Sequence, residues 1–277
     1  MIDAVLLDLD DTCFDQREFL AGAFGAVARR VGELGVDEVG MRDALVAIAA
    51  AGSDRGRIID RALETLGVRV PVGPLVDVFR AYRPARLSPY PGVREGLGQM
   101  RGLAPVGLVT NGDPAGQRAK IAALGLDDAF DVVVVSDELG RSFRKPHPAP
   151  FCQALRLLGA DPGRSFFIGD HPDRDIAGAQ HVGMRAVRVR TGEYASQPDV
   201  VTPWRTAPDA ASALRALCEL EPDDIVRPMD LTLPSAPLVS CRGRLTTCGS
   251  GGEARKAEEE RSGLSADRSC PAGLRAR

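Results

Sequence analysis

Near its start the chain reads Ala4-Val5-Leu6-Leu7-Asp8-Leu9-Asp10-Asp11-Thr12, an apolar run that ends in three carboxylates and a hydroxyl. The apolar part has the length of a short buried strand. Carboxylates placed this closely repel one another unless a cation lies among them, and hard divalent cations prefer such oxygen ligands. The stretch therefore predicts a strand that leads into a metal site with a nucleophilic aspartate.

The sequence after this strand is helical, with apolar residues three and four positions apart and no strand pattern between the helices. The expected helices cover about residues 16–34, 38–51, 54–66 and 74–83. Gly and Pro separate them, and the run Pro89-Tyr90-Pro91-Gly92 marks the end of the helical block. We therefore expect this block as an insertion directly after the first strand.

Beyond the block, helices alternate with short apolar strands. The strands are expected at residues 105–109, 132–135, 165–168 and 186–190. The helices are expected at about residues 93–102, 114–124, 148–158, 174–182 and 208–220. Short apolar strands that are each separated by a helix favour a parallel sheet covered on both faces. We predict an α/β fold: a Rossmann-like parallel sheet core with helices on both faces, plus a helical domain.

The composition argues against several classes of function. The chain has 277 residues, is 44% hydrophobic and carries a net charge of −3, which favours neither a nucleic acid polymer nor an anionic membrane as partner. No apolar stretch approaches a membrane span, and the N-terminus lacks the basic region of a signal peptide. The cysteines show no CxxC spacing, so no zinc site is indicated. We expect a cytoplasmic protein; no pattern indicates an oligomeric state.

Polar residues follow four of the predicted strands. They are Asp8 with Asp10, Thr110 with Asn111, Ser136 and Asp137 with Lys145 in the following loop, and Asp170 with Asp175. In a parallel sheet, ligands bind beyond the carboxyl ends of the strands. Four such clusters on one edge of one sheet predict a single site. Lys145 is one of only three lysines, with Lys120 and Lys256, among 35 basic residues.

These clusters resemble the haloacid dehalogenase (HAD) superfamily of phosphohydrolases over about residues 3–215. The four motifs occur in order as Asp8-Leu9-Asp10-Asp11-Thr12, Thr110-Asn111, Lys145-Pro146 and Gly169-Asp170-x4-Asp175. The helical block resembles the C1 cap of subfamily I. The stretches from Thr110 to Asp113 with Gln117 and Lys120, from Arg144 to Pro146, and from Gly169 to Pro172 are most similar to the nucleotidase and N-acylneuraminate phosphatase branch.

The resemblance and the chemistry of the residues assign the same roles at the first strand. Asp8 is the expected nucleophile, which forms an aspartyl-phosphate. Asp10 is the expected general acid and then general base. Mg2+ is the expected cofactor, held by Asp8, by the backbone carbonyl of Asp10 and by Asp170. Asp11 and Thr12 are expected to shape the turn.

The remaining motifs supply positive charge and hydrogen-bond donors. Lys145 is expected to offset the charge of Asp8 and of the phosphoryl oxygens. Thr110 and the Asn111 backbone N–H are expected to bind those oxygens. Asp175 is expected to support the metal-bound waters or to orient Lys145.

The resemblance implies three regions. Residues 1–13 and 89–221 are expected to form the core and residues 14–88 the C1 cap. Residues 222–277 are expected to form a disordered tail, because from residue 228 they are rich in Gly, Ser, Pro and Arg and lack aromatic residues.

We therefore predict a Mg2+-dependent phosphomonoester hydrolase for a small phosphorylated metabolite, such as a nucleoside monophosphate or a sugar phosphate. Three alternatives stay open. A 2-haloacid dehalogenase uses the same nucleophile on carbon but needs no metal, and Asp10 with Asp170 and Asp175 speaks against it. A phosphomutase and a non-catalytic binding protein of the same fold are the others.

Overall fold

The protein is described from a computed structural model that covers residues 1–53, 56–221 and 223–224. Apart from residues 223–224, the tail predicted for residues 222–277 lies outside the described residues. Within the described part, no helix combines the length and the apolar character needed to cross a membrane.

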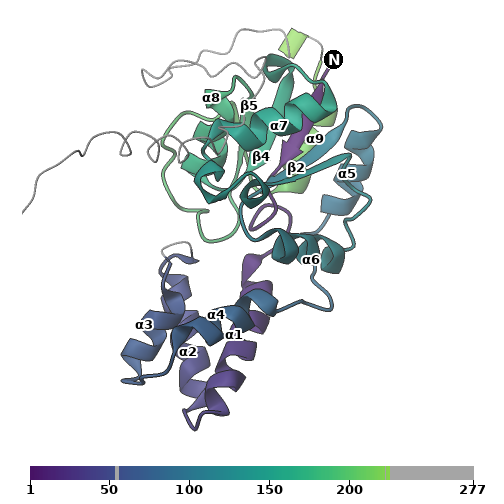
Figure 1. The fold of residues 1–277 in the computed structure, drawn as a ribbon. Helices are drawn as coiled ribbons and strands as arrows, with labels where there is room; N and C mark the ends of the chain where they lie inside the picture. The colour runs from purple at the N-terminus through teal and green to yellow at the C-terminus, as the bar shows by residue number, and fades with distance from the viewer. Residues whose placement is uncertain (54–55, 222, 225–277) are drawn as a thin grey trace, which may run out of the picture. The chain divides into compact units, whose positions relative to one another are not determined.

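Strand β1 (Ala4–Leu7) lies inside a six-stranded sheet of the described residues, ordered β3-β2-β1-β4-β5-β6 (Figure 1). The other strands are β2 (Val106–Thr110), β3 (Val132–Val135), β4 (Ser165–Gly169), β5 (Arg185–Val189) and β6 (Arg205–Ala207). All neighbouring strands pair in parallel. The α/β fold class predicted from the sequence is confirmed.

The strand order reverses at β1. The chain proceeds from β1 to β2 and β3 on one side, then returns to place β4 on the other side of β1. Leu7 lies in register with Leu108 of β2 and with Ile168 of β4. The residues that follow β1, β2 and β4 therefore meet at this switch point, where α/β proteins bind their ligands.

Side chains of β1 alternate between two apolar clusters, one on each face of the sheet. Val5 and Leu7 pack into one cluster, while Leu6 packs into the other. Helices α5 (Val93–Arg101), α6 (Pro114–Leu124) and α9 (Ala210–Cys218) contribute to the first cluster. Helices α7 (Pro148–Leu158) and α8 (Gly178–His181) contribute to the second. A strand buried on both faces explains the continuous apolar run.

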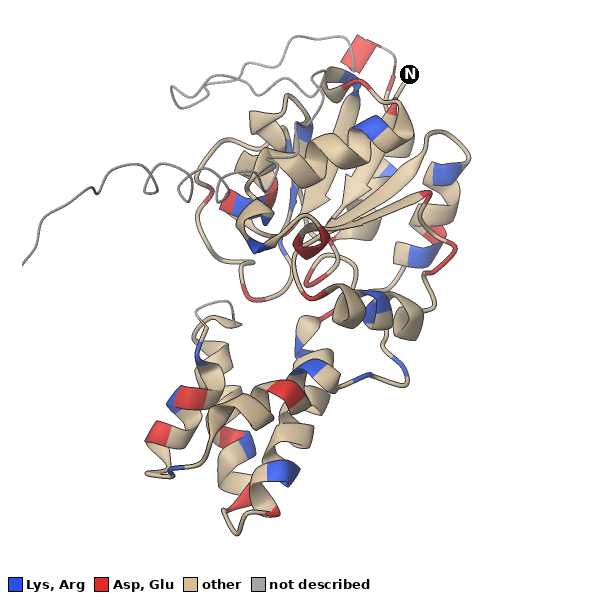
Figure 2. Ribbon diagram, viewed as in Figure 1, with Lys and Arg blue, Asp and Glu red and all other residues tan. Residues whose placement is uncertain are grey.

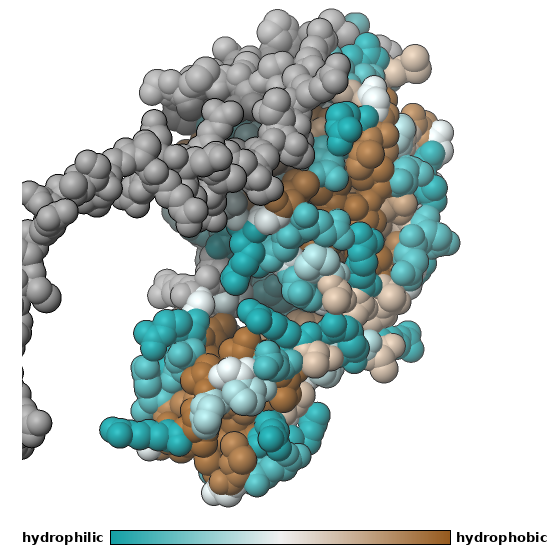
Figure 3. Space-filling model, viewed as in Figure 1, coloured by the Kyte–Doolittle hydropathy of each residue, from teal (hydrophilic) through white to brown (hydrophobic). Residues whose placement is uncertain are grey.

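The helical block between β1 and α5 has its own apolar core. It contains α1 (Gln16–Gly32), α2 (Glu38–Ala50), α3 (Ile58–Thr65) and α4 (Val72–Ala81). Phe24, Met41 and Leu75 are among its buried residues. Asp15 and Asp37 cap the first two helices by accepting backbone N–H bonds. Figure 3 shows apolar residues of this block at the surface in view, between polar ones.

Charged residues of both signs are interspersed over the helices of the block and of the sheet (Figure 2). Many form ion pairs on the surface, for example Arg30 with Glu33 and Arg118 with Glu138. Such exposed pairs contribute little to stability, about 0–1 kcal/mol each. The ion pairs of Lys120 and Lys145 with aspartates are instead buried and lie at the switch point.

The structure differs from the sequence-based prediction at two elements. The sequence analysis missed β6, because its three residues lie at an exposed edge and include no apolar run. The helix predicted at 174–182 is instead a π-helical segment, η5 (Pro172–Ala177), followed by α8. The N–H groups of both Asp175 and Ile176 bond to the carbonyl of His171, which widens the turn.

Candidate active site

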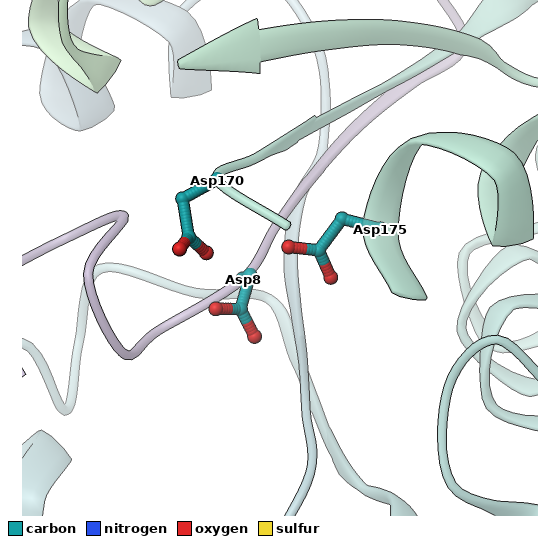
Figure 4. Close-up of side chains that lie close together, drawn as sticks. All are labelled: Asp8, Asp170 and Asp175. Atoms are coloured by element: carbon teal, nitrogen blue, oxygen red, sulfur yellow. The ribbon is translucent and has the colours of Figure 1, made fainter. Parts of the chain in front are cut away.

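Three buried carboxylates converge where β1 and β4 end. Asp8 follows β1, Asp170 follows β4, and Asp175 lies in η5. Each of the three offers a carboxylate oxygen, and these atoms all lie within 4.8 Å of one another. Figure 4 shows the carboxylates of Asp170 and Asp175 directed toward the region of Asp8. The structure thus brings together acids that are up to 167 residues apart in the chain (175 − 8).

Lys145 is the cation of this cluster. Its Nζ lies 2.5 Å from Asp8 Oδ1 and 2.7 Å from Asp175 Oδ1, and its side chain is only 2% exposed. Asn111 fixes the backbone of Lys145, because its Nδ2 donates to the Lys145 carbonyl at 3.1 Å and its Oδ1 accepts from the Lys145 N–H at 2.9 Å. The Asn111 side chain therefore positions the lysine, a role that the sequence analysis did not assign.

The electrostatics of the cluster favour an added cation. Burial, helped by the negative charges of Asp175 and Asp10, raises the pKa of Asp8 to about 7 against the attraction of Lys145. Burial and the charges of Asp175 and Asp8 also raise the pKa of Asp170 well above its ordinary value. Burial lowers the pKa of Lys145, but Asp175 and Asp8 outweigh it and bring the value to about 12. Three carboxylates and one ammonium leave an excess of negative charge and several oxygen ligands. Such a site suits a hard divalent cation such as Mg2+.

The carboxylate of Asp10 lies apart from this cluster and has partners of its own. Lys120 Nζ donates to Asp10 Oδ1 at 2.7 Å, and Gln117 Nε2 donates to Asp10 Oδ2 at 2.9 Å. Gln117 Nε2 also lies 2.6 Å from Thr110 Oγ1, which accepts the bond and keeps its own proton to donate. The sequence alone predicts no role for Gln117 or Lys120. For Lys120, the available signal was that lysine is scarce in this chain, with three lysines among 35 basic residues.

The turn after β1 is held by Asp11 and Thr12. Asp11 adopts a left-handed φ of 59°, and its carboxylate accepts the N–H groups of Gln16 at 2.9 Å and Glu193 at 3.1 Å. The Thr12 hydroxyl donates to Asp170 Oδ1 at 3.4 Å. The geometry is consistent with the turn-shaping roles expected for both residues.

A cavity of about 620 Å³ includes all seven predicted site residues in its lining. The seven are Asp8, Asp10, Thr110, Asn111, Lys145, Asp170 and Asp175. Helical-block residues line the same cavity, including Phe19, Phe79 and Tyr82. The Phe19 ring packs edge-on against Phe79 and tilted against Tyr82. Ser53, between α2 and α3, donates through its N–H and hydroxyl to the Glu193 carboxylate at 3.0 and 2.9 Å. The cavity is therefore polar at the strand ends and partly aromatic along the helical block.

Comparison with known proteins gives a consistent result. A family model described as haloacid dehalogenase-like hydrolase matches residues 2–183. The chain is 34% identical over 203 residues to glyceraldehyde 3-phosphate phosphatase from Methanopyrus kandleri, covering 70% of this chain and 86% of that protein. It is 38% identical over 160 residues to phosphoserine phosphatase from Thermus thermophilus, covering 56% and 62%.

Solved structures also match. One is a 2-haloacid dehalogenase from Pseudomonas syringae pv. Tomato DC3000, which is 28% identical, with a TM-score of 0.55. The match covers 78% of this chain and 98% of that one. The chain is thus similar to phosphatases and to a dehalogenase.

Proposed function

Because this chain belongs to the haloacid dehalogenase-like hydrolases, we propose that it is a Mg2+-dependent phosphomonoester hydrolase. Its proposed substrate is a small phosphorylated metabolite of the cytoplasm. One observation carries the proposal: Asp8, Asp170 and Asp175 are buried together around Lys145, within the same cavity as Asp10. The phosphatase names of two relatives support the reaction class.

In the first step, Asp8 attacks the phosphorus of the ester. A bond forms between an Asp8 carboxylate oxygen and phosphorus, and the bond from phosphorus to the leaving oxygen breaks. Asp10 gives its proton to the leaving oxygen, so that an alcohol departs instead of an alkoxide. Lys145 and the Thr110 hydroxyl, with the Asn111 N–H, stabilise the charge on the phosphoryl oxygens.

In the second step, water hydrolyses the aspartyl-phosphate. Asp10, now a carboxylate, takes a proton from the water as its oxygen attacks phosphorus. The bond between Asp8 and phosphorus breaks, which releases inorganic phosphate and regenerates the Asp8 carboxylate. The same residue thus acts as acid and then as base.

Mg2+ would be held by Asp8, Asp170 and the backbone carbonyl of Asp10, with Asp175 supporting from its position beside Lys145. When bound, it supplies positive charge that offsets the repulsion between the nucleophile and the phosphoryl group. The buried, electron-rich oxygens described above support this assignment.

Residues 14–88 are proposed as the cap, and residues 1–13 and 89–221 as the core. The apolar cluster that α1–α4 form among themselves supports this division. The cap's aromatic side chains line the cavity, where they would exclude water and select the leaving group.

The test is hydrolysis of p-nitrophenyl phosphate by the full chain. We expect turnover with Mg2+ and loss of turnover with EDTA. Asp8→Asn, which keeps the shape but removes the nucleophile, should abolish turnover and leave the far-UV circular dichroism unchanged. Absence of turnover on this ester and on a panel of metabolite phosphates would contradict the proposal, and retained activity in Asp8→Asn would remove Asp8 as the nucleophile.

The match to a 2-haloacid dehalogenase favours one second candidate, displacement of halide from carbon by Asp8. That chemistry needs neither Asp10 nor a metal. Release of chloride from 2-chloropropionate in the presence of EDTA distinguishes it. We expect no release, because the ion-paired Asp10 and the acidic pair Asp170 and Asp175 suit phosphoryl transfer.

A further inference from the structure

We propose that Lys120 is a positioning residue for Asp10 and that it acts through this carboxylate, without contacting the phosphoryl group. The role rests on the proposed phosphatase function, in which Asp10 transfers protons. The two buried lysines then have different roles: Lys145 acts on the nucleophile Asp8, and Lys120 acts on the acid and base Asp10.

The geometry around Asp10 supports this role. Gln117 and Lys120 are three residues apart on α6 and therefore lie on one face of the helix. Each donates to a different oxygen of Asp10, at 2.9 and 2.7 Å. A carboxylate offers about four lone-pair sites, so these two bonds fix its orientation and leave sites for the leaving oxygen or for water.

The burial of Lys120 supports the same role. The Lys120 side chain is 8% exposed, although a lysine is costly to bury unless its charge is paired. Its Nζ lies 4.3 Å from the centre of the Phe19 ring, on α1 of the proposed cap. The ammonium thus lies between a carboxylate and an aromatic face. Reduced solvent screening strengthens its pairing with Asp10.

The two buried lysines have different partners. Lys145 Nζ is engaged by Asp8 and Asp175, whereas the ion pair that the structure assigns to Lys120 within the described residues is with Asp10. Lys120 therefore affects turnover through proton transfer. A lysine that served only the fold would affect all substrates equally.

The experiment compares two esters of similar shape, p-nitrophenyl phosphate and benzyl phosphate. p-Nitrophenolate departs without a proton, whereas the benzyl alkoxide requires one. kcat/KM reports steps up to the first irreversible one, which includes protonation of the leaving oxygen. We expect Lys120→Met to lower kcat/KM about 30-fold or more on benzyl phosphate and less than about threefold on p-nitrophenyl phosphate, a part of the 10²–10⁴-fold range for general acid catalysis.

Two further variants serve as controls. Lys120→Arg keeps the charge and should return the ratio between the two esters to within about threefold of the wild-type ratio. Arg118→Met removes a positive charge from the exposed face of the same helix, where Arg118 pairs with Glu138, and should leave the ratio unchanged. If Lys120→Met does not fold, as judged by circular dichroism and melting, Lys120→Gln is measured in its place.

Two outcomes would overturn the inference while leaving the phosphatase proposal intact. One is an equal loss of kcat/KM on both esters in a folded Lys120→Met or Lys120→Gln variant. The other is a fall in the ratio between the esters that is as large in Lys120→Arg as in Lys120→Met. A wild-type chain that hydrolyses neither of these esters nor any phosphate of the metabolite panel overturns both proposals. A selective loss on benzyl phosphate with recovery in Lys120→Arg supports the inference.

Discussion

Lys145 and Lys120 are both buried, and each pairs with one aspartate of the turn after β1, but their surroundings come from different parts of the molecule. Lys145 pairs with Asp8 and Asp175, and its Nζ lies 5.3 Å from the ring of Phe167 in β4. Lys120 pairs with Asp10, and its Nζ faces Phe19 of α1.

The two ammonium groups of the site therefore differ in which part of the molecule surrounds them. The partners named for Lys145 all lie outside the helical block. The environment of Lys120 includes a ring from that block. In the proposed mechanism, proton transfer by Asp10 is therefore the step expected to respond to changes in the helical block, whereas attack by Asp8 is not.

The largest expected effect is that of Lys145→Met. Removing the ammonium leaves Asp8 and Asp175 as like charges and removes a proposed donor to the phosphoryl oxygens. We expect kcat/KM to fall by about 10²–10³ on p-nitrophenyl phosphate and on benzyl phosphate alike. The measurement is steady-state kinetics at saturating Mg2+. A loss confined to benzyl phosphate would contradict the assignment of Lys145 to the nucleophile.

Asp175→Asn tests what holds Lys145. The amide keeps the shape but removes the charge beside Nζ, and we expect about a tenfold loss of kcat/KM on both esters, within the range for losing an oriented charge pair. Titration with Mg2+ gives the second readout. A loss that raised Mg2+ fully reverses would make Asp175 a metal ligand instead of an orienting group for Lys145.

The raised pKa of Asp8 predicts how stability depends on pH. The folded chain without Mg2+ keeps the Asp8 proton up to about pH 7, whereas the unfolded chain loses it near the ordinary value of 3.8. The folded state thus binds more protons in this window, and this group's contribution, full below pH 3.8, is lost as pH rises toward 7.

Thermal melts of wild type and Asp8→Asn from pH 4 to 8 isolate this contribution as their difference. Mg2+ binds the ionised carboxylates, so its stabilisation of the wild type should grow from pH 5 to pH 8. A Mg2+ effect that is independent of pH, or equal in Asp8→Asn, would contradict the metal assignment.

The smallest expected effect concerns the two rings. Phe19→Leu removes the aromatic face beside Lys120 and should lower the kcat/KM ratio of benzyl to p-nitrophenyl phosphate about threefold, as for a cation–π contact of about 0.5–1 kcal/mol. Phe167→Leu is the matched variant at Lys145. It should lower the melting temperature through its core cavity without changing the ratio. If the ratio of kcat/KM between the two esters changed in Phe167→Leu and not in Phe19→Leu, the roles given to the surroundings of the two lysines would be contradicted.

Sequence analysis predicted the parallel sheet because its strands are buried on both faces and appear as continuous apolar runs. It missed β6, whose residues Arg205, Thr206 and Ala207 carry no such run. It predicted an α-helix around Asp175, where the backbone instead forms a π-helical turn through two bonds to the His171 carbonyl. Hydrophobic periodicity does not distinguish these helix types, because both are short here and bury one side.

The sequence by itself determined where the acids lie relative to the strands. Asp8, Asp10 and Asp170 each follow an apolar run within a few residues, so local sequence places them at strand ends. Only the tertiary structure decided which lysine meets which aspartate. Lys120 and Lys145 carry the same charge, and they reach Asp10 and Asp8 across 110 and 137 residues of chain. That choice depends on the strand order around β1 and on the face that α6 presents, which are properties of packing and not of local sequence.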